Sequence, residues 1–326
     1  MNERCWPEDR LRSSPNGAPM PQWTTRRREA RMKGARSHRY RVVDVFTEEP
    51  LEGNPLAVFP DASGIDDATM QKIARELSLS ETTFVLPARR AGCAAFVRIF
   101  TPARELAFAG HPTIGTAFVL RDEGVVPSPS ERFALEEGVG PVPVRVEAGE
   151  RPRIWLETPP IRFGKSFDRG RCARALGLEA GDLLDPAPEL VSAGNPAVFV
   201  AVRDKDAVDR AGLDLHGARA LRGDDPEALC VFVFTPTREG AYSRMFAPEY
   251  GVTEDPATGS LTGPLAAFMM RHRLVSSASG TRFVSEQGVK MQRRSILHVH
   301  VRGEAGADGI DVGGHVVPLV EATMII

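Results

Sequence analysis

Polar residues able to transfer protons or bind anions occur in three segments of this sequence where an apolar core would not require them. The first segment is Ser78-Leu79-Ser80-Glu81-Thr82-Thr83-Phe84-Val85, in which a carboxyl group stands between a helix end and an apolar strand. Burial disfavours the charged form of a carboxyl group, so a partly buried Glu81 would be suited to proton transfer. The alternative is a surface glutamate on a loop, the commoner setting for this residue type.

The second segment, Phe108-Ala109-Gly110-His111-Pro112-Thr113, has the composition of a helix start. Gly110 allows close approach of another backbone, and proline is tolerated in the first helical turn. His111 would then lie at a helix N-terminus, where free N–H groups favour an anion. The alternative is a capping turn with a purely structural role.

The third segment, Glu254-Asp255-Pro256-Ala257-Thr258-Gly259-Ser260, is again a turn, followed by an apolar helix over Leu265–Met270. Its Gly259-Ser260 pair stands where Gly110-His111 stands in the second segment. Two helix N-termini that face one cleft would suit a substrate carrying a carboxylate. The alternative is an ordinary N-cap, which aspartate, threonine and serine all favour.

These segments belong to an internal repeat that covers most of the chain. Three pairs of motifs recur in the same order, with offsets of 141, 146 and 149 residues between their members. The repeat predicts two similar halves of about 140 residues, each mostly β-structure with one long central helix. We expect the halves to join near the Pro- and Gly-rich stretch Glu137–Pro152. The pairs are Gly53-Asn54-Pro55 with Gly194-Asn195-Pro196, Arg98–Pro102 with Arg244–Pro248, and Gly110–Thr113 with Gly259–Thr262.

The elements that must position the first two segments can be read from hydrophobic periodicity. Asp66 is a plausible N-cap, and apolar residues follow it at helical spacing as far as Leu77. A second helix is expected from Gly110 to Leu120. Residues rich in β-branched and aromatic side chains predict strands around these helices. The predicted strands are Tyr40–Phe46, Leu56–Phe59, Thr82–Leu86 and Phe96–Phe100.

Composition excludes several classes of function. The 326 residues are 42% hydrophobic and 26% charged, as in soluble globular proteins, and their number suggests two domains, with one as the alternative. No run approaches the about 18 apolar residues that cross a bilayer, so we expect no membrane partner. Beyond residue 39 the net charge is −8, which disfavours nucleic acid as a partner.

Cofactor and metal motifs are missing from the sequence. No glycine-rich nucleotide-binding loop follows a predicted strand. Four scattered cysteines without a Cys-x-x-Cys spacing fit a reducing, cytoplasmic compartment with neither a zinc site nor a disulfide framework. His298-Val299-His300 alternates along a strand, and we interpret it as an exposed strand face and not as a metal site.

Residues 1–39 differ from the remainder of the chain. They carry a net charge of +6, are rich in arginine, proline and serine, and have no hydrophobic period. We interpret them as a disordered basic extension. A nucleic-acid-binding arm and a transit peptide are the alternatives for a run such as Arg26-Arg27-Arg28-Glu29-Ala30-Arg31.

Taken together, these motifs resemble those of the PhzF family, the phenazine-biosynthesis PhzF-like proteins. The resemblance extends from about Tyr40 to the C-terminus. One segment, Met291-Gln292-Arg293-Arg294-Ser295, departs from a family pattern closer to Met-Gly-Arg-Pro-Ser, which leaves the substrate less determined. The matching segments are Val43–Thr47, Gly53–Val58, Leu79–Val85, Arg98–Pro102, Phe108–Thr113, Glu254–Ser260 and Glu286–Gly288.

The resemblance implies an α+β fold like that of diaminopimelate epimerase. Such a fold has two pseudo-symmetric lobes, each a β-barrel-like sheet around a central helix, with the site between them. We therefore expect an N-terminal lobe over residues 40–145 and a C-terminal lobe over residues 146–315. Residues 316–326 would cross back to complete the first lobe.

The resemblance also bears on the chemistry. Epimerases and racemases of this fold use two cysteines as acid and base, each preceding the glycine at a helix start. Ala109 and Thr258 occupy those places here, and neither can carry a proton as a thiolate does. PhzF-like proteins depend instead on a glutamate, which corresponds to Glu81. Their characterised member isomerises dihydro-3-hydroxyanthranilate without a cofactor.

We therefore expect an isomerase that needs neither cofactor nor metal and acts by proton transfer on a small carboxylated metabolite. One alternative is an amino-acid-type epimerase or racemase. Another is a non-catalytic small-molecule-binding protein of the same fold, and a homodimer is the assembly considered. The expected catalytic residues are Glu81 as acid/base, with His111 and Asp255 orienting the substrate and relaying protons; Gly110, Gly259 and Ser260 would bind its carboxylate.

Overall fold

The computed structural model describes residues 36–127, 131–225, 228–302 and 309–326. The chain divides into two compact units. The described part of the first is residues 36–38 and 324–326, in which the backbones of Arg36 and Ile326 exchange two hydrogen bonds of 2.6 and 2.9 Å. The second unit, Arg39–Thr323, contains the candidate site.

Most of the predicted basic extension, residues 1–35, lies outside the described residues. Its end is part of the first strand, β1 (Ser37–Val45), which begins three residues before the predicted start at Tyr40. The earlier start has a physical reason, because side chains alternate from the first residues and His38 is buried.

The first half of the chain contains the elements that the sequence predicted around the first two motif segments. The helix after Asp66 is present, and the Asp66 carboxylate accepts a hydrogen bond of 2.9 Å from the Thr69 backbone N–H. The elements that follow β1 are β2 (Asn54–Phe59), α2 (Asp67–Leu77), β3 (Glu81–Leu86), β4 (Cys93–Phe100), β5 (Glu105–Leu106), α3 (Gly110–Asp122), β6 (Arg132–Glu137), β7 (Gly140–Glu147) and β8 (Arg153–Glu157).

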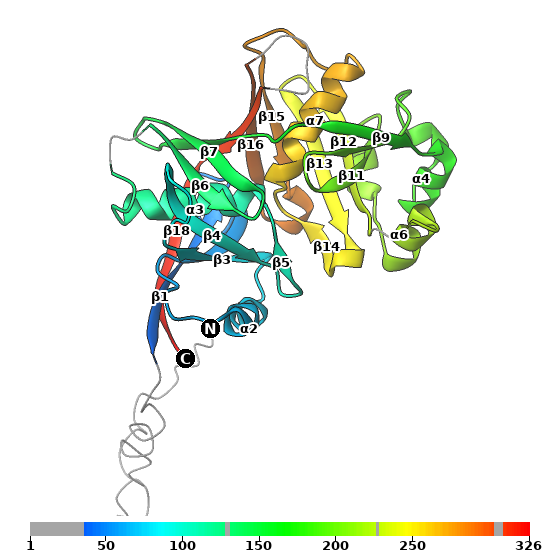
Figure 1. Cartoon of the computed structure of the whole chain (residues 1–326). Helices are drawn as coiled ribbons and strands as arrows, with labels where there is room; N and C mark the ends of the chain where they lie inside the picture. The colour runs from blue at the N-terminus through cyan, green and yellow to red at the C-terminus, as the bar shows by residue number, and fades with distance from the viewer. Residues whose placement is uncertain (1–35, 128–130, 226–227, 303–308) are drawn as a thin grey trace, which may run out of the picture. The chain divides into compact units, whose positions relative to one another are not determined.

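The second half has more helices than expected (Figure 1). The elements are β9 (Arg162–Ser166), α4 (Arg169–Ala175), η1 (Ala180–Asp182), β10 (Glu189–Ser192), β11 (Pro196–Ala201), α5 (Lys205–Arg210), α6 (Leu215–Arg222), β12 (Cys230–Thr237), β13 (Gly240–Ala247), η2 (Pro248–Tyr250), β14 (Val252–Asp255), α7 (Gly259–Arg271), β15 (Arg282–Gln287), η3 (Val289–Met291), β16 (Ser295–Val301), β17 (Ile310–Gly314) and β18 (Val316–Ile325).

Strand pairing repeats in the same order in the two halves. From β1 to β8 the successive pairs are β1–β2 antiparallel, β2–β3 parallel, β3–β4 antiparallel, β4–β6 parallel, β6–β7 antiparallel and β7–β8 antiparallel. From β10 to β17 the same series of directions recurs through β11, β12, β13, β15 and β16. α3 and α7 lie at the same step of each series. The α+β class is therefore confirmed, and β18 pairs with β1.

Each of these two helices is buried along most of its length. α3 packs among the apolar residues of β1, β2, β4, β6 and β7, and α7 among those of β11, β12 and β16. A third apolar cluster was not predicted. In it, α4, α5 and α6 cover the opposite face of β11 and β12 from α7, because alternate residues such as Val198 and Phe199 point to opposite faces. One central helix per half was thus an incomplete prediction for the second half.

The stretch predicted as the join, Glu137–Pro152, contains β7, and the predicted boundary between residues 145 and 146 falls inside that strand. Pro141 and Pro143 are exposed, and the valines that alternate with them are buried. The prolines pair with β6 only, since the β7–β8 register begins at Val144. A strand tolerates proline where one of its edges needs no N–H donor.

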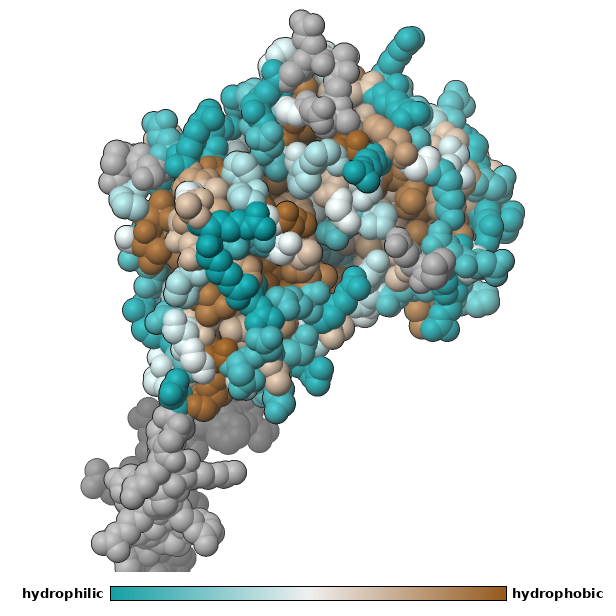
Figure 2. Space-filling view, in the orientation of Figure 1, coloured by the Kyte–Doolittle hydropathy of each residue, from teal (hydrophilic) through white to brown (hydrophobic). Residues whose placement is uncertain are grey.

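The part of the chain that the structure describes contains no helix long and apolar enough to span a membrane. Hydrophilic side chains cover much of the face shown in Figure 2, with apolar patches between them. In the same described ranges, no group of three or more His, Cys, Asp or Glu side chains is arranged to hold a metal ion.

A buried carboxyl group supports the first turn of α3. Glu137 at the end of β6 is 3% exposed, and its Oε1 accepts a hydrogen bond of 2.7 Å from the Thr113 hydroxyl. Burial raises the pKa of Glu137 to about 8. A pKa that is higher in the folded than in the unfolded chain makes the protein lose stability as the pH rises toward that value.

We expect Glu137→Gln to unfold at a higher temperature than the wild type at pH 9, with a much smaller difference at pH 5. Glutamine keeps an acceptor for Thr113 but has no charge to bury. Thermal unfolding of both proteins across this pH range measures the effect. The exposed Glu131→Gln is the control, and a difference for Glu137→Gln that shrinks as the pH rises would contradict the prediction.

Candidate active site

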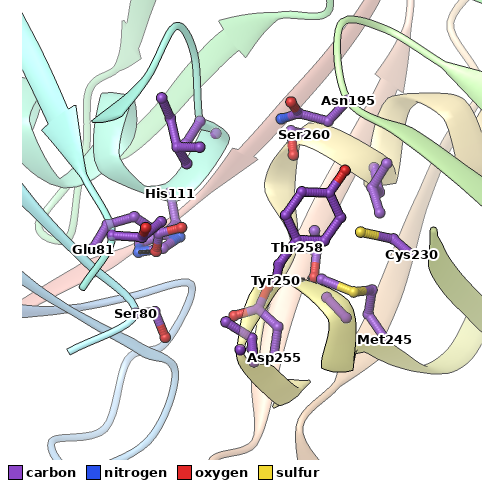
Figure 3. A pocket seen from close by; sticks show the side chains of 18 of the residues that line it. Ser80, Glu81, His111, Asn195, Cys230, Met245, Tyr250, Asp255, Thr258 and Ser260 are labelled. Atoms are coloured by element: carbon purple, nitrogen blue, oxygen red, sulfur yellow. Dashed lines mark hydrogen bonds and ion pairs between the residues drawn. The ribbon is translucent and has the colours of Figure 1, made fainter. Parts of the chain in front are cut away.

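A cavity of about 490 Å³ is lined by residues from both repeats. The structure brings all six predicted site residues to this cavity, although they lie up to 179 positions apart in the chain. Figure 3 shows Glu81 and His111 on one side of it, with Cys230, Met245 and Tyr250 on the other. The six residues are Glu81, Gly110, His111, Asp255, Gly259 and Ser260.

The side chains of Glu81 and His111 lie next to each other in the wall of the cavity. Glu81 is the first residue of β3, His111 is the second residue of α3, and Glu81 Oε2 lies 3.2 Å from His111 Nε2. Burial, together with the negative charge of Asp255, raises the pKa of Glu81 well above its usual range. Burial lowers the pKa of His111 to about 3. Burial thus favours the neutral form of both groups, and His111 is a neutral imidazole at neutral pH.

Asp255, at the end of β14, is the third titratable group. Its Oδ1 accepts a hydrogen bond of 2.8 Å from the Asn54 amide, and its Oδ2 accepts one of 2.5 Å from the Thr258 hydroxyl. Burial raises the pKa of Asp255 to about 6, and these two hydrogen bonds oppose the rise. Asp255 is thus mostly ionised at neutral pH.

Three polar residues around Asp255, namely Asn54, Thr258 and Gln287, were not assigned a role from the sequence. Asn54 is fully buried, and its amide also donates to the Ala257 carbonyl at 3.0 Å. Gln287 donates to the Asp255 carbonyl at 2.7 Å and to the Thr258 hydroxyl at 2.9 Å. The repeated Gly-Asn-Pro motif was a signal for Asn54, but its contacts depend on tertiary structure.

The two helix starts are in direct contact. A Cβ on Gly110 would lie 2.6 Å from the Ser260 nitrogen, and one on Gly259 would lie 3.4 Å from the Gly110 carbonyl carbon. Neither α3 nor α7 has a side-chain cap: the N-cap of α3 is Ala109, which has no polar side chain, and the N-cap of α7, Thr258, donates to Asp255 instead. The ordinary N-cap considered for the third segment is therefore wrong. N–H groups in both first turns remain for an anion.

The opposite wall holds the counterpart of Glu81. Glu81 is paired with Leu56 on β2, two residues after Asn54, and Cys230 is paired with Ala197 on β11, two residues after Asn195. Cys230 thus occupies the repeated position of Glu81. Burial raises the pKa of the Cys230 thiol to about 12, so it stays protonated at neutral pH.

Other predicted features lie outside the cavity. His298 and His300 do not form an exposed face: both are partly buried, with ring centroids 6.4 and 6.2 Å from that of the buried Trp155. In the departing segment, Gln292 caps η3 and Arg294 forms an ion pair of 2.7 Å with Glu286. Neither of these two residues lines the cavity, so the departure does not change its wall.

The family model described as phenazine biosynthesis-like protein, PhzC-PhzF, matches residues 43–322. The chain belongs to the PhzC-PhzF family. It is 37% identical to trans-2,3-dihydro-3-hydroxyanthranilate isomerase of Pseudomonas aeruginosa over 281 residues, which cover 85% of this chain and 96% of that protein. A protein of Clostridium acetobutylicum called an uncharacterized isomerase is 32% identical, over 80% of this chain and 88% of its own length.

Solved structures agree with the family assignment. A PhzF-family phenazine biosynthesis protein of Bacillus anthracis superposes with a TM-score of 0.80 at 26% identity, covering 89% of this chain and all of that one. A predicted epimerase of Pseudomonas aeruginosa gives 0.74 at 35% identity, covering 88% and 99%. These names confirm the expectation of a PhzF-like enzyme of the isomerase class.

Proposed function

We propose that this member of the PhzC-PhzF family is a cofactor-independent isomerase that transfers a proton within a small carboxylated metabolite. The observation that carries the proposal is the Glu81–His111 pair, which lines the same cavity as two uncapped helix starts. The site would lie between an N-terminal lobe of residues 40–145, completed by 316–326, and a C-terminal lobe of residues 146–315.

In this proposal the substrate carboxylate is bound by Ser260 and by the backbone N–H groups of Gly110 and Gly259. In its ionised form, Glu81 removes a proton from one carbon of the substrate and then, as the acid, gives a proton to another carbon, so it ends each turnover as a carboxylate. A carboxyl group whose pKa is raised is a stronger base once ionised, which suits it to this step. Asp255 and His111 orient the substrate, and Asp255 relays the proton.

An epimerase is the second candidate, because one relative at 35% identity is described as a predicted epimerase. Inversion at one carbon usually uses an acid and a base on opposite faces of the substrate. Ala109 and Thr258 occupy the helix-start positions, and burial raises the pKa of Cys230 on the opposite wall to about 12, which makes its thiol a weak acid. The Glu81–His111 pair on one wall therefore favours isomerisation over inversion.

The proposal can be tested with carboxylated metabolites drawn from an extract by the protein. Each captured compound is incubated with the enzyme in deuterated water, and the product is examined for deuterium and for stereochemistry. An isomerised product supports the proposal, and deuterium bound to its carbon shows how far the proton held by Glu81 exchanges with solvent during turnover. Labelling with inverted configuration and no change of connectivity would indicate the epimerase, and binding with neither product nor label would indicate a binding protein.

A further inference from the structure

We propose that Asn54 is a positioning residue that keeps the proton of His111 on Nε2. Asn54 is fully buried at the first position of β2, in a motif that the proposed mechanism does not use. Its Nδ2 lies 3.2 Å from His111 Nδ1, in addition to its hydrogen bonds to Asp255 and Ala257.

The orientation of the Asn54 amide follows from its partners. Asp255 Oδ1 and the Ala257 carbonyl are acceptors at 2.8 and 3.0 Å, so the amide nitrogen must face them. The amide nitrogen has two hydrogens and does not accept, so one N–H is shared between two of its three neighbours, and His111 Nδ1 can take part in their contact only as an acceptor. A neutral imidazole that accepts on Nδ1 carries its proton on Nε2.

This tautomer has a consequence for Glu81. In this tautomer the protonated Nε2 of His111 lies 3.2 Å from Glu81 Oε2. Whenever Glu81 is protonated, its other carboxyl oxygen is then the one placed to carry the proton. A second proton on His111 would place Nδ1–H against the Asn54 amide hydrogens, so the same contact opposes formation of an imidazolium beside Glu81.

The repeat supplies a matched comparison. Asn195 holds the position of Asn54 in the second half, and its amide donates to the Phe108 carbonyl at 3.4 Å. Phe108 lies two residues before Gly110, as Ala257 lies two residues before Gly259. Both asparagines thus bind the turn before the opposite helix, but only Asn54 contacts titratable side chains.

The test is long-range proton–nitrogen NMR of the full chain labelled with ¹⁵N-histidine, with His111 assigned by comparison with His111→Asn. We expect the wild type to show the Nε2–H form at pH 7. Asn54→Asp would supply an acceptor for Nδ1–H, so we expect that proton to appear and the His111 titration midpoint to rise by about one pH unit or more.

Asn195→Asp should leave the His111 signals unchanged, because Asn195 does not contact this ring. A wild-type spectrum with the proton on Nδ1 would overturn the proposal without any variant. The proposal would also be overturned if Asn54→Asp gave the dispersed spectrum of a folded protein while His111 kept its wild-type tautomer and titration midpoint. If Asn54→Asp fails to fold, the wild-type spectrum alone decides.

A separate observation concerns the ligand. We propose that Arg104 binds a second anionic group, a carboxylate distal to the one at the helix starts; this rests on the proposed function. Arg104 lines the cavity, and its guanidinium lies 4.8 Å from the centroid of the Tyr250 ring. No carboxylate among the described residues forms an ion pair with it, whereas Arg98 is paired with Glu105.

The position of Arg104 beside the Tyr250 ring leaves its guanidinium able to bind an anion. Tyr250 is held by a hydrogen bond of 3.0 Å from its hydroxyl to the Ala228 carbonyl. Stacking uses the face of a guanidinium and leaves its N–H edge for a planar acceptor such as a carboxylate. Among the described residues that line the cavity, Arg104 is the one with a cationic side chain at neutral pH, since His111 is neutral there.

The test compares benzoate with benzene-1,3-dicarboxylate by calorimetry. We expect the dicarboxylate to bind the wild type about tenfold more tightly or better, and Arg104→Gln to remove that advantage while keeping benzoate affinity. The control is Arg89→Gln. Arg89 is exposed and does not line the cavity, and its guanidinium lies 3.8 Å from the centroid of the Phe96 ring. This substitution should change neither affinity.

Equal wild-type affinity for the two probes, or an Arg104→Gln loss that is the same for both, would overturn the role of Arg104 alone. Ser260→Ala should weaken both probes alike, because it acts at the shared carboxylate. Failure of both probes to bind the wild type would instead contradict the carboxylate site of the proposed function, and the Arg104 proposal with it.

Discussion

Replacing Glu81 with glutamine is expected to abolish isomerisation, with a loss of about 10²–10⁴ in rate, while the protein folds and binds carboxylates as before. Glutamine keeps the size of the side chain and an acceptor toward His111, but it cannot exchange the proton. Turnover of the substrate found by the labelling experiment, in deuterated and in ordinary water, measures the effect. Glu105→Gln, which removes the surface partner of Arg98, is the control.

The pH dependence of the stability of Glu81→Gln tests whether burial raises the pKa of the Glu81 carboxyl group. The pKa of Glu81 is raised in the folded chain, so its ionisation destabilises the wild type as the pH rises toward that pKa. Glu81→Gln should therefore be more stable than the wild type at alkaline pH and close to it at pH 4. Wild-type turnover by this variant would contradict the mechanism and make Asp255 the next candidate for the acid/base.

Gly110→Ala is expected to push apart the two helix starts that line the cavity. Its Cβ would lie 2.6 Å from the Ser260 nitrogen and 2.7 Å from the Gly259 carbonyl carbon, which are backbone atoms of α7. The two helix starts must then separate. We expect a loss of about 1–3 kcal/mol in the free energy of unfolding, together with loss of benzoate binding.

Urea unfolding and calorimetry measure these two effects. Gly212→Ala is the control, because a Cβ at Gly212 meets no other atom within 4 Å and its backbone is not in the left-handed region. If Gly110→Ala kept wild-type stability and still bound benzoate, close contact of the helix starts would not be needed for the site.

The sequence predicted the elements whose signals are local. Asp66 caps α2 as expected, α3 begins at Gly110, and the repeated motifs correspond to a repeated order of strand pairing. The convergence of Glu81, His111 and Asp255 on one cavity followed from motif resemblance, because no local pattern joins residues so distant in the chain.

What was missed depends on tertiary contacts. The prolines of β7 suggested a linker, and only the pairing of that strand with β6 on one edge explains why they are tolerated. The short helices α4, α5 and α6 are capped by Asp168, Asp204 and Asp214, but each has too few apolar residues to show a helical period in the sequence. The role of Asn54 required knowledge of what lies across the cavity.

The matching registers of Glu81 and Cys230 bear on the history of this fold. A half-length ancestor that paired with a copy of itself would have carried the same residue at both positions and two equivalent centres in one cavity. Joining two copies in one chain frees each position to change alone. Here one half has a carboxyl group at this position and the other a thiol that stays protonated at neutral pH, so a ligand would meet two walls of different chemistry.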